Sequence, residues 1–153
     1  MKKFRFQLET LLKVTRMKKD QAEVAFAEAS KRLTEARDRL TELMQEMQQG
    51  HHDYDELAKG KITLGTLMAY NSFFDWKRQQ IEQQQHVIVE ANAERQKKLK
   101  LLMEIMAKLK SIEQLKEKRL QEYKAELLHE EQKMLDEIGS QLYTRGHRKE
   151  DAV

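Results

Sequence analysis

Apolar residues recur at alternating spacings of three and four along the first part of the chain. The series is Leu33, Ala36, Leu40, Leu43, Met47, Gly50, Tyr54 and Leu57. This spacing places its members on one stripe of a helix and is the heptad pattern of a coiled coil. The sequence therefore predicts a first long helix, over about residues 4–57, with a seam that packs against another helix.

A second series with the same spacing follows. Its members are Leu67, Tyr70, Phe74, Lys77, Ile81, Gln84, Ile88, Ala91, Arg95, Lys98, Leu102, Ile105, Leu109 and Ile112. Ten of these fourteen are apolar, which is enough for a packing seam that polar side chains interrupt at four places. We expect a second helix over about residues 66–142.

The segment between the two series breaks the helical pattern. It contains Gly60 and Gly65 together with Thr63 and Thr66, and we expect a turn at about residues 58–65. Either threonine could cap the second helix, because a hydroxyl accepts a hydrogen bond from a free N–H of the first turn.

Folding the chain at this turn makes an antiparallel hairpin, in which paired seam residues must keep a nearly constant sum of residue numbers. Leu33 with Ile88, Leu40 with Ile81, Met47 with Phe74 and Tyr54 with Leu67 satisfy this condition, and Leu8 with Ile112 and Leu11 with Leu109 are off by one. Two independent periodicities thus agree on one register. We predict an all-α fold: a long antiparallel two-helix coiled coil within one chain, forming a single elongated domain over residues 1–153.

The same register makes the second helix longer than the first. It should overhang by about 25 residues, or roughly 35 to 40 Å at 1.5 Å per residue. Leu115, Leu120, Tyr123, Leu127, Leu128, Met134, Leu135 and Ile138 would then lack a partner in the chain and form a binding surface. Residues 143–153 are polar and without period, and we expect a disordered tail there.

Composition agrees with long helices rather than a globular core. The chain is 39% hydrophobic and 36% charged, and it has no proline and no cysteine. The absence of cysteine excludes disulfides and thiolate metal sites, and a cytosolic location is the default expectation. No segment resembles a secretory signal or reaches transmembrane length.

Catalytic chemistry has no visible basis in the sequence. Acidic residues are spread along helix faces without a cleft that could shift a pKa, so we expect no enzyme and no cofactor. The pair His51 and His52 beside Asp53 does not suit a metal, since neighbouring helical residues point about 100° apart. We expect no metal site.

Positive charge is concentrated in two blocks, with seven basic residues among the first 20 and nine among residues 95–119. A solvated helix surface explains most of them, and a contact surface is the alternative. Binding to nucleic acid is a further alternative, but no recognition motif supports it. Near the turn, Phe73 and Trp76 lie off the seam and are candidates for an exposed contact surface.

Three groups of residues resemble the FliJ family of flagellar export proteins. The first is the opening Phe4-x-Phe6-x-Leu8-x-x-Leu11-Leu12-x-x-x-x-Arg16 with the alanine-rich helix that follows it. The second is the turn leading to Tyr70-Asn71-x-Phe73 and Gln80-Ile81-Glu82, and the third is Glu131-Gln132-Lys133-x-Leu135-Asp136-Glu137. Together they cover both helices and the turn.

The resemblance implies a stalk-like coupling factor that links the hexameric flagellar export ATPase to the cytoplasmic domain of the membrane export gate and escorts export chaperones. It implies a monomer when free, located in the cytoplasm and peripherally at the inner membrane by the flagellar base. The candidates for ATPase contact are Lys2, Lys3, Arg5, Lys13, Arg16, Lys18, Lys19, Met134 and Ile138. The candidates for gate contact are Tyr54, Tyr70, Phe73 and Trp76. The alternatives are the equivalent protein of a virulence type III secretion system and a coiled-coil scaffold or tether.

Overall fold

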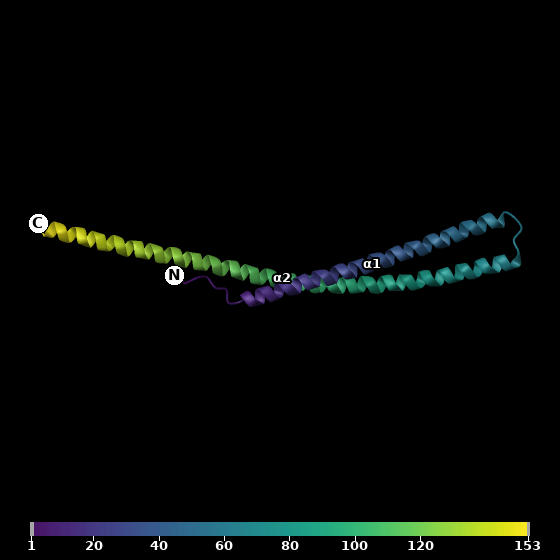
Figure 1. Ribbon diagram of the computed structural model, residues 1–153, viewed down its shortest axis with the longest axis horizontal. Coiled ribbons are helices and arrows are strands. Elements are labelled where there is room, and N and C mark those ends of the chain that lie inside the picture. Colours follow the sequence, from purple (N-terminus) through teal and green to yellow (C-terminus); the bar gives the residue numbers. More distant parts are fainter. Residues whose placement is uncertain (1, 153) are drawn as a thin grey trace. The chain divides into compact units, whose positions relative to one another are not determined.

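The computed structural model describes residues 2–152 and contains two long helices packed against each other as an all-α hairpin (Figure 1). Helix α1 spans Glu9–Ala58 and α2 spans Leu64–Asp151. Contacts divide the chain into two compact units, and each unit takes a part of both helices. We call Met17–Met106 the turn-side unit, and Met1–Arg16 with Ala107–Val153 the terminal unit.

The turn occupies residues 59–63, close to the predicted 58–65. After α1 ends, the backbone N–H of Gly60 donates to the carbonyl oxygen of Leu57. Thr63 caps α2, because its Oγ1 accepts a hydrogen bond from the backbone N–H of Thr66 at 3.2 Å. This cap starts α2 at Leu64, two residues before the position expected from the sequence.

The core of the turn-side unit follows the predicted seams. The buried apolar side chains are Ala22, Ala29, Leu33, Ala36, Leu43, Phe74 and Leu102, and Leu40, Met47 and Ile81 are half-buried. Leu57, the last member of the first series, is instead largely exposed, because α1 ends one residue later.

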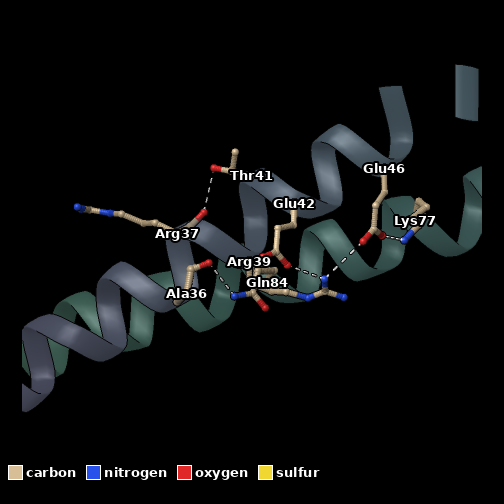
Figure 2. Close-up of polar contacts among 8 residues, drawn as sticks. All are labelled: Ala36, Arg37, Arg39, Thr41, Glu42, Glu46, Lys77 and Gln84. Carbon is tan, nitrogen blue, oxygen red and sulfur yellow. Dashed lines mark hydrogen bonds and ion pairs between the residues drawn. The ribbon is translucent and has the colours of Figure 1, made fainter. Parts of the chain in front are cut away.

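Polar residues in the α2 seam find partners on α1. Figure 2 shows the amide of Gln84 donating to the carbonyl oxygen of Ala36 at 2.9 Å, and the ammonium group of buried Lys77 paired with Glu46. Farther along α2, the guanidinium group of Arg95 donates to Ser30. Because buried polar groups are costly without partners, these contacts make polar seam positions compatible with close packing.

The terminal unit is packed around Leu12, which is fully buried, with Thr15 and Leu109. Leu8 and Leu11, which the sequence pairs with the second helix, are exposed at 37% and 47%, so neither belongs to the buried core. Counted backward from Ala22, the seam of α1 passes through Lys19, Thr15 and Leu12. Two of these positions, Lys19 and Thr15, are polar. Thr15 tolerates burial because its hydroxyl donates to the carbonyl oxygen of Leu11 at 2.7 Å.

Residues 2–8 lie outside α1, so the predicted helix start at residue 4 was also wrong. The alternation of Phe4 and Phe6 suits an extended segment, in which every second side chain shares a face. The ring of Phe4 lies 5.5 Å from that of Tyr123 on α2, and Phe6 is buried. The Tyr123 hydroxyl donates to the carbonyl oxygen of Lys2, which gives the segment a backbone anchor.

Beyond Leu127, every described residue of α2 is exposed. The helix continues to Asp151, so the disordered tail expected at 143–153 is not observed over its described part, and Val153 lies outside the described residues. Arg148 and Lys149 in the last turn favour helix, because cations interact well with the negative end of the helix dipole. Tyr143 also stacks on His147 one turn later.

Candidate docking surfaces

An aromatic cluster lies near the turn, on facing sides of α1 and α2. The ring of Phe74 stacks on His51 at 4.1 Å between centroids, and Tyr54 meets Tyr70 edge-on at 5.4 Å. Phe73 adds an edge-on contact to Phe74 at 5.5 Å. Contacts of this kind fix ring orientations and hold the two helices together next to the turn.

Phe73 is half-buried because its ring packs directly on Gly50. A Cβ atom at residue 50 would lie 2.5 Å from Cε1 of that ring, which is closer than real carbon contacts allow. Beside the ring, Gly50, Asp53, Ala69, Tyr70 and Phe73 line an open hollow of about 290 Å³. The hollow brings two of the predicted gate contacts, Tyr70 and Phe73, onto one surface.

Trp76 is the most exposed of the predicted gate contacts, at 55% of its full area. The ammonium group of Lys77 lies 5.1 Å from the Trp76 ring and 5.6 Å from the Phe73 ring, so a cation faces both. Tyr54 is half-buried within the aromatic cluster. We call Tyr54, Tyr70, Phe73 and Trp76 the turn-side aromatic surface.

The terminal unit has a hollow of its own, of about 600 Å³, between the N-terminal segment and α2. It is lined by Lys2, Lys3, Phe4, Arg5, Tyr123, Glu126, Leu127 and Glu130. Three predicted ATPase contacts, Lys2, Lys3 and Arg5, are therefore together and exposed at this hollow. Basic groups on one wall face carboxylates on the other, which suits a partner with charges of both signs.

Of the two remaining basic candidates in the terminal unit, one is engaged in an ion pair. Arg16 lies 3.4 Å from the carboxylate of Glu113, and Lys13 is exposed. Glu9 accepts a hydrogen bond from Lys116 at 2.9 Å. That hydrogen bond, with the positive charges of Lys116 and Lys13, holds the pKa of Glu9 below its ordinary value.

The remaining predicted ATPase contacts fall into two places. Met134 and Ile138 are exposed on the part of α2 beyond Leu127. Lys18 and Lys19 belong to the turn-side unit, where Lys19 pairs with Glu23 at 3.5 Å and Lys18 is exposed.

Three residues that shape these surfaces carried little signal in the sequence. Gly50 was assigned to the seam, but its packing contact with the ring of Phe73 was not predicted. Lys77 stood in the seam without a known partner, and Tyr123 was grouped with unpaired apolar residues although its hydroxyl anchors the N-terminal segment. A glycine inside an otherwise unbroken helix was the one usable signal, since such a glycine often has a packing reason.

Neither surface resembles a metal site or a membrane span. Among residues 2–152, no group of three or more His, Asp or Glu side chains could hold a metal ion. No helix in that range is long and apolar enough to cross a membrane. What the two surfaces offer is exposed aromatic, basic and aliphatic groups, which are suited to protein contacts.

Comparison with known proteins adds a family to this geometry. No curated protein and no solved structure gave a significant match. A family model described as "Flagellar FliJ protein" matches residues 4–148, which include α1, the turn, α2 as far as Arg148 and all the surfaces described above except Lys2 and Lys3. The chain therefore belongs to the FliJ family of flagellar proteins, a family of non-enzymatic proteins of flagellar protein export.

Proposed function

We propose that this protein is a coupling factor that links the hexameric flagellar export ATPase to the cytoplasmic domain of the membrane export gate and escorts export chaperones. The family match over residues 4–148 carries the proposal, because it places the chain in flagellar export. The location would be the cytoplasm and the periphery of the inner membrane at the flagellar base. The virulence-system alternative and a general tether receive no support from the match.

The terminal unit is the proposed ATPase-binding part. Its support is the exposed basic group of Lys2, Lys3 and Arg5, together with Met134 and Ile138 on the exposed end of α2. Complementary charges across an interface raise the association rate and select the orientation, while apolar side chains supply affinity. Arg16, Lys18 and Lys19 extend the basic sequence along α1.

The turn-side aromatic surface is the proposed gate-binding part. Trp76 and the partly exposed ring of Phe73 have the size and exposure of interface anchors. Since the two surfaces belong to different units, each can be altered without touching the other.

Co-precipitation with the export ATPase tests the proposal. We expect binding by the full chain and strong loss after truncation following Leu127, which removes residues that are exposed throughout the described range 128–152. Charge reversal of Arg16, Lys18 and Lys19 should weaken ATPase binding and leave the helix content unchanged, because these side chains contribute little to folding. Normal ATPase binding by both variants at low salt would refute docking through the terminal unit. The Trp76→Ala variant is the control, since Trp76 belongs to the turn-side aromatic surface and not to the proposed ATPase contacts.

A further inference from the structure

The end of α2 beyond Leu127 presents an unpaired apolar face. We call residues 128–151 the C-terminal overhang. Leu128, Leu135 and Leu142 recur every seven residues, and Ile138 lies between the last two. Each is at least half exposed, from 50% at Ile138 to 68% at Leu135. A heptad stripe of large aliphatic side chains is the face that one coiled-coil helix offers to another.

Charge along the overhang and the residues just before it is divided into two halves. Residues 126–137 contain five carboxylates, Glu126, Glu130, Glu131, Asp136 and Glu137, against the single Lys133. Residues 138–151 contain three basic side chains, Arg145, Arg148 and Lys149, and their only carboxylates are Glu150 and Asp151 at the end of α2. The change of sign falls at Ile138, near the middle of the apolar stripe.

This division makes the overhang complementary to itself in one orientation. In an antiparallel pair related by a two-fold axis near Ile138, the acidic half of each helix lies beside the basic half of the other. A parallel pair would place like charges together along its whole length, and like charges oppose association. Around the axis the antiparallel pair keeps an apolar contact, because Leu142 of one helix lies beside Met134 and Leu135 of the other, whereas Leu128 lies beside Arg148.

We propose that the C-terminal overhang binds the overhang of a second copy of this chain as an antiparallel two-helix coiled coil. The pair replaces the sequence-based expectation of a free monomer. It buries Ile138, one of the proposed ATPase contacts, so a paired chain and an ATPase-bound chain are mutually exclusive. The inference uses only the stripe and charges of the overhang and does not rest on the proposed function.

Sedimentation equilibrium of the full chain over a range of concentrations tests the pairing. We expect the mass to rise from that of the 18.3 kDa monomer toward twice that value, and to fall back at high salt. Replacing both Leu135→Glu and Leu142→Glu should raise the dissociation constant by about 100-fold or more, since four buried leucines are lost per pair. Val89→Glu, an equally exposed position in the turn-side unit, is the matched control and should change nothing. A monomer at every concentration, or a dimer insensitive to the leucine changes, would overturn the inference.

Charge exchange tests the acidic and basic halves. Reversal of Arg145 and Arg148 to Glu should abolish pairing, and further reversal of Glu130 and Glu131 to Lys in the same chain should restore it. Failure of the fourfold variant to recover while its helix content stays intact would contradict the complementarity argument.

Cross-linking tests the orientation, because the natural chain has no cysteine. Gly139→Cys lies near the proposed axis and Gly146→Cys lies away from it, and both sites have open space around a new side chain. An antiparallel pair should form a disulfide through residue 139 and not through residue 146. Efficient cross-linking at both sites would indicate a parallel pair and refute the proposal. ATPase binding by the leucine variant is measured in a separate experiment. The pairing of overhangs and the proposed ATPase binding can therefore be refuted independently of each other.

Discussion

Gly50 on α1 leaves the space that the ring of Phe73 on α2 occupies, with only 2.5 Å between Cε1 of the ring and the place where an alanine Cβ would stand. The contact explains why a glycine persists within an uninterrupted helix. Glycine costs roughly 1 kcal/mol relative to alanine at such a position, so only a packing gain on the partner helix offsets it. Here the gain is the close approach of an aromatic ring.

Gly50→Ala should therefore destabilise the turn-side unit despite its better helix propensity. Overpacking costs about 1 to 3 kcal/mol and exceeds the propensity gain of roughly 1 kcal/mol. Chemical denaturation measures the net change. Gly139→Ala, on an exposed helical site with nothing within 4 Å, is the matched control and should stabilise α2 locally by about 0.5 to 1 kcal/mol. Adding Phe73→Leu should recover part of the Gly50→Ala loss, and an additive double variant would contradict the contact.

A second prediction concerns the packing of the buried seam, where truncating a core leucine should lower the free energy of unfolding. Leu43 is 2% exposed between the helices, so Leu43→Ala should cost about 2 to 4 kcal/mol by removing apolar contacts and leaving a cavity. Leu128→Ala changes the same residue type at an exposed site and should cost less than about 0.5 kcal/mol in the monomer. Thermal unfolding by circular dichroism compares the two. Equal melting temperatures would show that the seam is not the core.

The ion pair between Glu46 and Lys77 makes stability depend on pH. The hydrogen bond from Lys77, together with the charges of Lys77 and Arg39, holds the pKa of the Glu46 carboxyl below its ordinary value of 4.5. A carboxyl whose pKa is lower in the folded state contributes stability above its unfolded pKa and loses that contribution as the pH falls through the folded pKa. The contribution of Glu46 should thus be full at neutral pH and be lost progressively as the pH falls below 4.5.

Comparing wild type with Glu46→Gln measures that contribution. At pH 7 the variant should melt lower, because Lys77 is buried and loses its charged partner. As the pH falls below 4.5, the difference between the two melting temperatures should shrink. In a Lys77→Met background the Glu46→Gln change should have little effect at neutral pH or in acid, and a persistent difference there would assign the effect to something other than this pair.

The seams were predictable from sequence because heptad spacing reports directly on the face that a helix buries, as Leu33, Leu43 and Phe74 show. The N-terminal boundary of α1 could not be predicted, since the spacing of Phe4 and Phe6 fits a helix about as well as an extended segment. Their conformation is decided by the distant Tyr123, through its ring and its hydroxyl. Thr15 was missed for a similar reason, because a buried polar residue becomes acceptable only once its hydrogen bond is known.

The candidate surfaces show the same division between local and tertiary information. The exposure of Trp76 follows from its place off the seam, which the spacing reveals. The half-burial of Phe73 depends on Gly50, which lies on the other helix, and no pattern within α2 contains it. Residues that pack across the hairpin thus need the register before their exposure can be judged.

Trp76 and Phe73 separate gate binding from folding. Trp76→Ala removes a largely exposed ring, so we expect a change in unfolding free energy within about 0.5 kcal/mol, together with a clear loss of binding to the cytoplasmic domain of the export gate. Phe73→Ala removes a ring seated on Gly50 and should lower both the melting temperature and gate binding. Isothermal titration against the gate domain measures gate binding, and thermal unfolding of the same samples measures stability. ATPase binding is the control, because Trp76→Ala should leave it unchanged. If Trp76→Ala binds the gate domain normally while Phe73→Ala loses only stability, these rings serve the helix pair alone and the gate-binding assignment is wrong.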